Sequence, residues 1–478
     1  MKKSTLVAGV IVALAAAYGA SSWYVGQQAQ NRIETAIADG NSRLGKVLGE
    51  ELSSRPVQLS VSRYDRGWFS SSIIYSLKFT DAAGKVSEYL LADELQHGPL
   101  PWSALTKGQF TPVLAISDAT LMPTASSQRW FDALGGKSPL HIASKLGFSG
   151  AGQSQWHFEA LEFSTDEQAK VSFGGGQIDM TFASGFETVT TRGEFPSLSA
   201  RLPDGDSVAI DAVTIHKSYA FGDNQNAEVR FEATDLRYVG TDGQTLRFEG
   251  FSLTGKSAEQ SGLFDGNAQY AAKGVHVSDI NLGTVSAAFQ VNRLDLKALQ
   301  ALTTEYDAIL AEQGVSDNDL ADLGSKETLR LRGHVFELLK SRPSLALEPF
   351  EWDNGEGKSS VSAKVDFVRP DFALIDATDN EILLKALGQV DVSVSLSKSM
   401  VAKTYAQIMS EGEAPERAHA KARMMFDMYA GLLVRSGLAS YVDGVLTSAL
   451  VYKNEQFVIN GKTMTVPELL DSLSLNGL

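Results

Sequence analysis

The stretches AEVRFEATDLRYV (227–239) and TLRFEGFSLTG (245–255) decide the fold, because apolar and polar residues alternate in both. In the first stretch, Val229 and Phe231 alternate with the charged residues Glu228, Arg230 and Glu232. An alternation with a period of two is typical of a β-strand that is buried on one face only. The short segment between the stretches contains Asp and Gly, which favour tight turns. The two stretches therefore predict neighbouring antiparallel strands.

The same pattern continues over the centre of the chain, residues 155–291, as a series of short strands. Gly, Asp and Asn interrupt the strands every 8–15 residues. This spacing is typical of a meandering antiparallel sheet or an open barrel. One face of the predicted sheet is apolar and the other carries Glu, Asp, Arg, Thr and Gln. The residues assigned to the apolar face are Val171, Phe173, Ile178, Met180, Phe182, Val208, Ile210, Val229 and Phe231.

Segments with helical spacing of apolar residues accompany the strands. They cover residues 27–52, 295–312, 326–340, 379–387, 401–409, 415–434 and 466–473. Thr465 and Glu468 form a capping box before the last segment. A hairpin is expected at residues 450–459. The predicted fold class is α+β with β dominant: an N-terminal transmembrane helix, then an extended antiparallel sheet flanked by amphipathic helices.

The length of 478 residues favours about three domains, or two large ones. We divide the chain into residues 1–26 as a transmembrane anchor, 27–55 as a helical stalk, 56–293 as a β-rich domain, 294–397 as a helix pair with further strands, and 398–478 as a helical C-terminal region with a hairpin. The stalk has two interpretations. It packs on the body of the protein, or it pairs with the stalk of a second copy.

The N-terminus predicts the compartment. Lys2 and Lys3 precede an apolar stretch at residues 6–25. About 20 apolar residues are needed to cross a bilayer as a helix. Because lysines stay on the cytoplasmic side, the body is expected outside the cytoplasm. The alternative is a signal peptide that is cleaved after Gly19. The anchor positions are Leu6, Val10 and Leu14, with Trp23 and Tyr24 at the far interface.

Charge and cysteine content exclude several classes of function. The chain has 57 acidic and 42 basic residues, a net charge of −15, which argues against nucleic acid as the main partner. It contains no cysteine, which excludes disulfides, thiolate zinc sites, Cys-ligated iron–sulfur clusters and cysteine nucleophiles. The absence of thiols also suits an oxidising compartment.

Three short motifs carry a family resemblance. Residues 64–71 read Tyr-Asp-Arg-Gly-Trp-Phe-Ser-Ser, residues 97–100 read His-Gly-Pro-Leu, and residues 457–462 read Phe-Val-Ile-Asn-Gly-Lys. Together with the apolar N-terminus, they resemble the YdgA-like family of bacterial inner-membrane-anchored periplasmic proteins of unknown function. The resemblance implies the envelope of a Gram-negative bacterium, with a single-pass anchor, a cytoplasmic N-terminus and a periplasmic body. It implies no biochemical activity.

We interpret the motif residues mainly as structural. We expect a turn at Gly67, a corner buried by Trp68 and Phe69, a strand end at Gly98, and a tight turn with positive φ at Asn460. The alternative for the two aromatic residues is a partner-binding surface. Among the seven histidines, His97 is the best candidate for a functional role. The candidate positions are Arg66, Gly67, Trp68, Phe69, His97, Gly98, Pro99, Asn460 and Gly461.

Patterns that carry chemistry are incomplete in this sequence. The histidines are never three or four residues apart, and HExxH and GxSxG are absent. The stretches 136–138 and 461–463 lack the earlier glycine of a phosphate-binding loop. We therefore assign no catalytic, cofactor-binding or metal-binding residue. Two carboxylates that are distant in the sequence but close in space stay open as a hydrolytic pair.

The apolar face of the predicted sheet must be covered. Either helices from 295–340 and 400–446 close a core, or the sheet curls into an open groove that receives lipid acyl chains. The Met-rich segment 424–432 is read as core, or as an adaptable contact. We favour a non-catalytic envelope protein that binds or scaffolds lipid acyl chains or other envelope proteins. The alternatives are a periplasmic hydrolase of envelope polymers and a structural homo-oligomer, such as a homodimer.

Overall fold

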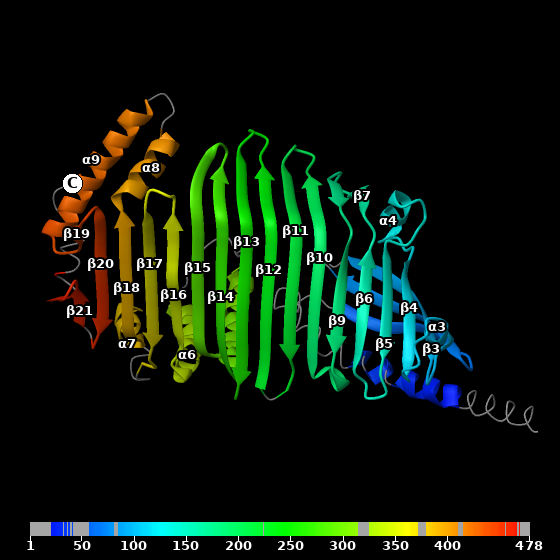
Figure 1. Ribbon diagram of the computed structural model, residues 1–478. Helices are drawn as coiled ribbons and strands as arrows, with labels where there is room; N and C mark the ends of the chain where they lie inside the picture. The colour runs from blue at the N-terminus through cyan, green and yellow to red at the C-terminus, as the bar shows by residue number, and fades with distance from the viewer. Residues whose placement is uncertain are drawn as a thin grey trace, which may run out of the picture. The chain divides into compact units, whose positions relative to one another are not determined.

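The computed structural model describes residues 21–31, 33–35, 37–38, 41, 57–80, 85–222, 224–313, 325–370, 379–409, 414–454, 456–465 and 468. The chain forms two compact units, unit 1 (Met1–Phe221) and unit 2 (Gly222–Leu478). Antiparallel strands dominate both units, and short helices accompany them (Figure 1), so the predicted β-dominant α+β class is confirmed. The boundary between the units falls inside residues 56–293, which the sequence analysis assigns to one domain.

Unit 1 is a meander in which neighbours along the chain are mostly neighbours in the sheet. The strand order is β1-β2-β3-β4-β5-β6-β9-β10-β11, and the β7–β8 hairpin joins β10 beyond the end of β9. Two short helices lie between strands, α3 (Trp102–Thr106) and α4 (Gln128–Ala133). The strands are β1 (Val57–Arg66), β2 (Ser70–Thr80), β3 (Val86–His97), β4 (Ala115–Met122), β5 (Leu140–Leu146), β6 (Gly152–Phe158), β7 (Leu161–Ser164), β8 (Lys170–Phe173), β9 (Gly176–Phe182), β10 (Thr188–Arg201) and β11 (Ser207–Ala220).

Unit 2 is a second antiparallel meander, in the order β12-β13-β14-β15-β16-β17-β18-β20-β21-β22, with β19 beside β20. The predicted hairpin at 450–459 is present as β20–β21. The strands are β12 (Asn224–Val239), β13 (Thr245–Gln260), β14 (Leu263–Val277), β15 (Ile280–Asp295), β16 (Ser344–Asp353), β17 (Lys358–Phe367), β18 (Leu387–Ser397), β19 (Ser440–Val442), β20 (Val445–Lys453), β21 (Gln456–Ile459) and β22 (Lys462–Met464).

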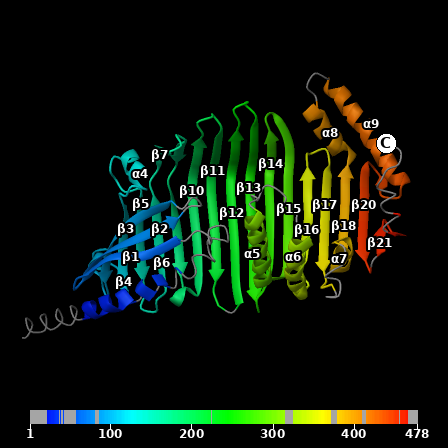
Figure 2. The ribbon, with the colours of Figure 1, turned by 180° about the vertical axis from the view of Figure 1, so that it is seen from behind.

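The helices of unit 2 follow the predicted segments within a few residues. Figure 2 shows α5 and α6 side by side in front of one face of the sheet. The last predicted helix, 466–473, lies outside the described residues except for Glu468. Its carboxylate accepts the Thr465 backbone N–H at 2.8 Å, as a capping box requires. The helices are α5 (Leu296–Gln313), α6 (Ser325–Leu338), α7 (Asp379–Ala386), α8 (Lys398–Met409) and α9 (Pro415–Arg435).

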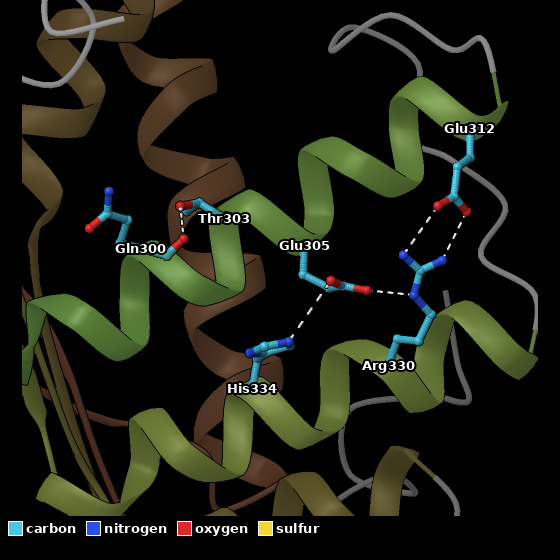
Figure 3. Close-up of polar contacts among 6 residues, drawn as sticks. All are labelled: Gln300, Thr303, Glu305, Glu312, Arg330 and His334. Carbon is cyan, nitrogen blue, oxygen red and sulfur yellow. Dashed lines mark hydrogen bonds and ion pairs between the residues drawn. The ribbon is translucent and has the colours of Figure 1, made fainter.

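Arg330 of α6 joins that helix to α5 (Figure 3). Its Nε donates to Glu305 Oε1 at 2.5 Å, and its two terminal nitrogens donate to Glu312 at 2.8 and 3.3 Å. His334 Nε2 lies 4.0 Å from the second oxygen of Glu305. Hydrogen bonds from Arg330 hold the pKa of Glu312 below its usual range. The two carboxylates lie two helical turns apart, so one guanidinium fixes the register of the helix pair.

Three phenylalanine side chains of unit 1 pack together on one face of the sheet. In unit 1, Phe195 pairs with Val213 and Leu198 pairs with Ile210 in one continuous register, and Ala212 on β11 has a φ of 48°. The rings of Phe158, Phe173 and Phe195 have centroids 6.0 to 6.4 Å apart. These side chains therefore lie on one face, and Phe173, which the sequence analysis assigns to the apolar face, is one of them.

The Met-rich segment of α9 is divided between core and solvent. Phe426 and Ala430 are buried with Ala439 and Leu446 of the neighbouring chain segment. By contrast, the side chain of Met424 is 70% exposed. The core interpretation of residues 424–432 therefore holds for the helix face that carries Phe426, and the methionine on the other face points to solvent.

The predicted anchor is only partly visible. Leu6, Val10 and Leu14 lie outside the described residues, whereas Trp23 and Tyr24 belong to a helix that includes residues 21–31. We call this segment the N-terminal helix; residues 33–35, 37, 38 and 41 are also helical. Within the part of the chain that the structure describes, we find no helix with the length and apolarity that a membrane crossing requires.

Candidate functional site

The N-terminal helix packs on the first strands of unit 1. Val25 and Ala29 are one turn apart on the helix, and both are buried. They form a core with Ile73 of β2 and Leu95 of β3, together with Leu114 and Ala115. The motif residues of 66–69 and 97–99 gather around this contact, although they come from separate parts of the sequence.

His97 is the centre of the motif cluster. Its Nε2 lies 2.8 Å from Ser71 Oγ, and its Nδ1 lies 3.4 Å from the carbonyl oxygen of Trp68. A carbonyl oxygen only accepts, so Nδ1 carries the proton and Nε2 accepts from the Ser71 hydroxyl. His97 is 1% exposed, and burial lowers the pKa of its imidazole. The ring is therefore a neutral, buried hydrogen-bonding group.

Gly26 lets the N-terminal helix approach His97. A Cβ at this position would lie 2.3 Å from His97 Nδ1, well inside van der Waals contact. The imidazole is held by Ser71 and Trp68, so it has no nearby position into which it can move. The sequence analysis did not single out Gly26, because the need for a glycine in this helical segment is apparent only when the position of the His97 ring is known.

The Ser71–His97 pair resembles the start of a nucleophilic catalytic unit, but its location is unsuited to catalysis. Ser71 is 2% exposed, and the N-terminal helix lies over the histidine. A substrate carbonyl would need to reach the Ser71 hydroxyl. The packing leaves no space for one, and the hydrogen bond joins β2 to β3 beneath the helix.

Trp68 and Phe69 differ from the prediction that they bury a corner. Their side chains are 65% and 53% exposed. The turn contacts the body through its backbone: the Trp68 carbonyl faces His97 Nδ1, and the Phe69 carbonyl accepts the His97 N–H at 2.8 Å. Since main-chain atoms fix the turn, both side chains are left pointing outward. Arg66 lies over the Trp23 ring, 5.4 Å from its centroid, in a cation–π contact.

Gly98 and Pro99 follow the last residue of β3, where the prediction places a strand end. The Gly98 N–H donates to the Leu114 carbonyl at 2.8 Å, and the Val113 N–H donates to the Pro99 carbonyl at 2.9 Å. A Cβ on Gly98 would lie 1.7 Å from the Val113 carbonyl oxygen. This position therefore requires glycine, because the backbones at the two ends of the loop 98–114 lie in direct contact here.

Asp93 of β3 is a buried carboxylate that the sequence analysis missed. Ser117 Oγ donates to its Oδ1 at 2.8 Å, and Tyr75 Oη donates to its Oδ2 at 3.2 Å. Burial raises the pKa of Asp93, and the two hydroxyl donors oppose that rise in part. The signal was present, because Leu91, Asp93 and Leu95 alternate along β3 and place the carboxylate on the inner face.

Asn460 and Gly461 form the predicted tight turn, and the prediction of positive φ is confirmed. Their φ angles are 49° and 83°. The Asn460 side chain also accepts the Ala449 N–H at 2.9 Å and donates to the Gly437 carbonyl at 3.3 Å. The turn therefore ties β20 to the end of α9, which is a structural role.

A groove runs along the strands of unit 2 between β12 and β15. Cross-strand pairing places Val229, Gly255, Ala268 and Phe289 in one row on one face. The neighbouring row is Ala227, Ser257, Gly266 and Val291. Small residues on the two central strands form most of the floor, the ring of Phe264 of β14 covers Gly266, and Val229, Phe289 and Val291 on the outer strands form the walls. We call this feature the β12–β15 groove; its volume is about 300 Å³.

A second hollow lies in unit 1, where Gly174–Gly176 pass Phe195 and Pro196. Its volume is about 660 Å³. The strand pairing aligns His157, Gln177 and Glu194 across it in one row. The hollow is also lined by Phe158, Phe195, Pro196 and Val213, so its lining mixes polar and apolar groups. The lining of the β12–β15 groove is almost entirely apolar, which is the character expected for an acyl chain.

The buried imidazole of His97 predicts a loss of stability on acidification. Its pKa in the folded state lies below the ordinary value of 6.5. Between these two values the unfolded chain takes up a proton that the folded protein does not, so the free energy of unfolding decreases as pH falls. Below the folded-state pKa, this group causes no further loss.

His97→Gln should remove this part of the pH dependence, and the exposed His216→Gln is the matched control that keeps it. Urea unfolding of the full-length protein, at pH values below and above 6.5, measures the difference. Equal pH dependence in the two variants would contradict the assignment of a neutral, buried His97.

Comparisons with known proteins cover nearly the whole chain. The family model for a bacterial protein of unknown function, DUF945, matches residues 1–467. Protein YdgA of Escherichia coli (strain K12) is 23% identical, over 100% of this chain and 98% of that protein. The uncharacterized protein YihF of the same organism is 24% identical, over 97% of each chain. No solved structure matches this chain.

Proposed function

The chain belongs to the DUF945 family of bacterial proteins of unknown function, and on this premise we propose that it is a non-catalytic envelope protein that binds lipid acyl chains. The resemblance to YdgA-like proteins is thereby confirmed. In this proposal the apolar N-terminal segment anchors the protein in the inner membrane. The body lies in the periplasm, and the β12–β15 groove receives the acyl chain.

The lining of the groove is the observation that supports this proposal. Gly255, Ser257 and Ala268 leave a low floor across the two central strands, and the ring of Phe264 bounds this floor at Gly266. Val229 on β12 and Phe289 on β15 rise on either side, three strand spacings or about 14 Å apart. A channel of this kind admits a flexible methylene chain, and each buried methylene contributes about 0.8 kcal/mol.

The large apolar side chains near the groove are unusually open to solvent. Phe289, Tyr270 of β14 and Leu345 of β16 are all exposed. Cross-strand pairing puts the three residues on the same face of the sheet. Contiguous exposed apolar surface of this kind marks a binding site. Lipid tails are the apolar partner that a membrane-anchored protein meets at high local concentration.

The polar clusters favour a binding protein over an enzyme. Ser71 and His97 are sealed beneath the N-terminal helix, and Asp93 is held by Tyr75 and Ser117 within the same packed region. Each of these clusters satisfies its own hydrogen bonds, and each stabilises the fold. The groove, by contrast, offers open volume lined by groups that bind through apolar contact.

Photolabelling tests the proposal. Full-length protein in detergent is irradiated with a fatty acid that carries a diazirine on its chain, and the labelled peptides are identified. We expect labels on β12–β15. Ala268→Trp fills the floor and displaces at least two methylenes, so labelling there should fall about tenfold. Gln269→Trp is the matched control, because the next residue along a strand points to the opposite face.

Equal labelling of β12–β15 in Ala268→Trp and Gln269→Trp would contradict binding in the groove. Labels concentrated in unit 1 would also contradict it. Circular dichroism of both variants checks that the sheet is retained, so that a loss of labelling in only one of them reports the groove.

A further inference from the structure

Exposed aromatic side chains gather at one end of unit 1. Among the described residues of this unit, the large aromatic side chains that are exposed have exposed fractions from 41% to 74%. They are Trp23, Tyr24, Trp68, Phe69, Trp102, Phe110 and Phe148. Aromatic residues of this size are normally at least half-buried in a folded unit, so seven exposed ones need an explanation.

Strand pairing puts the loops that carry five of these residues at the same end of the strands. Ser70 pairs with Gln96, His97 pairs with Ala115, and Ala115 pairs with Leu146. The turn 67–69, the loop 98–114 and the turn 147–151 therefore leave the sheet at one end. We call this end of the sheet the aromatic end. The turn 67–69 carries Trp68 and Phe69, the loop 98–114 carries Trp102 and Phe110, and the turn 147–151 carries Phe148.

The N-terminal helix brings the remaining two aromatic residues to the aromatic end. Gly26 packs on His97, the last residue of β3, and Arg66 lies over the ring of Trp23. Figure 1 shows this helix at the end of the sheet where β4 begins and β5 finishes. The opposite end of unit 1 is different, because the large apolar side chains that are exposed on or near it are Val86, Leu198, Leu202 and Val208, none of which is aromatic.

We propose that the aromatic end seats unit 1 on the lipid bilayer, with these side chains in the interfacial layer. Trp and Tyr favour this layer because their rings are apolar and their N–H or O–H groups still reach water. The apolar stretch 6–25 enters unit 1 through Trp23 and Tyr24, so a bilayer that holds the stretch lies against this end. The inference rests on the anchor in the proposed function and is independent of the β12–β15 groove.

A bilayer explains the pattern better than a protein partner does. The seven side chains come from four separate chain segments, and what they share is the end of the unit on which they lie. A flat interfacial layer contacts side chains that lie at one end of a protein, whichever chain segments they come from. The surface is aromatic rather than basic, so its contact depends on ring burial and only weakly on anionic head groups.

The absence of cysteine allows a direct test with single-cysteine variants of the full-length protein. Phe110→Cys and Phe148→Cys report on the aromatic end, and Val86→Cys and Leu202→Cys are matched controls at the opposite end. Each variant is labelled with an environment-sensitive dye and reconstituted in phosphatidylcholine vesicles with and without a doxyl-labelled lipid. Dyes within the interfacial 5–10 Å should be quenched at least about twofold, and the controls should keep their emission.

Vesicle flotation separates this inference from the anchor on which it rests. If the protein does not float with the vesicles, both the anchor and the membrane-seated end are wrong. If it floats and all four dyes behave alike, the anchor stands and the inference is overturned. A dye at Phe110 or Phe148 that shifts to the blue without lipid quenching would indicate a protein contact, which also overturns it.

Discussion

Replacing Gly26 by alanine should release the N-terminal helix from unit 1 and lower the free energy of unfolding by about 1–3 kcal/mol. The added methyl group would lie 2.3 Å from His97 Nδ1. The ring cannot turn aside without giving up its contacts with the Ser71 hydroxyl and the Trp68 carbonyl oxygen. The helix must therefore move away, and Val25 and Ala29 lose their packing on Ile73 and Leu95.

Urea unfolding and limited proteolysis of the full-length protein measure this effect. Gln27→Ala is the matched control, because it places the same methyl group on the exposed face of the same helix. Combining Gly26→Ala with His97→Ala removes the clash, so the added cost of the glycine change should shrink in that background. If Gly26→Ala is as stable and as resistant to protease as Gln27→Ala, the packing described for His97 is wrong.

Gly98→Ala should be still more damaging, with a loss of about 3 kcal/mol or more. Its Cβ would meet the Val113 carbonyl oxygen at 1.7 Å, and a backbone atom has less freedom to shift than a side chain. Moving the two segments apart breaks the hydrogen bonds from Gly98 to Leu114 and from Val113 to Pro99. The loop 98–114 then loses its attachment, and Trp102 and Phe110 lose their positions.

Gly333→Ala is the control for Gly98→Ala, because a Cβ at Gly333 has no neighbour within 4 Å. This residue lies inside α6, where alanine is the better helix former by about 1 kcal/mol, so the control should gain stability. Hydrogen exchange of the peptides from residues 98–114 reports the loop directly. Unchanged protection of that loop in Gly98→Ala would contradict the close backbone crossing.

The sequence predicted the strands well because their signal is local. Val229 and Phe231 alternate with charged residues, and β12 pairs with β13 as the first two stretches indicate. The short strand β5 was not predicted, since its inner positions include Ser144, which breaks the apolar pattern. Only the fold supplies its partner: the Ser144 hydroxyl lies 2.8 Å from that of Ser154 on β6.

The site was harder to predict because it depends on contacts between residues that are far apart in the sequence. The motif positions around His97 were identified, but the corner expected from Trp68 and Phe69 was wrong, since backbone carbonyls rather than rings fix that turn. Gly26 has meaning only beside His97, some 70 residues later. The groove depends on which small residues of four strands fall in one row, and this requires the strand register.

Native mass spectrometry of the full-length protein tests the central claim, acyl-chain binding in the β12–β15 groove, most directly. Both the wild type and Gln269→Trp should retain a bound fatty acid or phospholipid after exchange into fresh detergent. Ala268→Trp should lose it, because the indole occupies the floor between Val229 and Phe289. If all three proteins carry the same lipid load, or none carries any, the groove does not bind acyl chains and the proposed function is wrong.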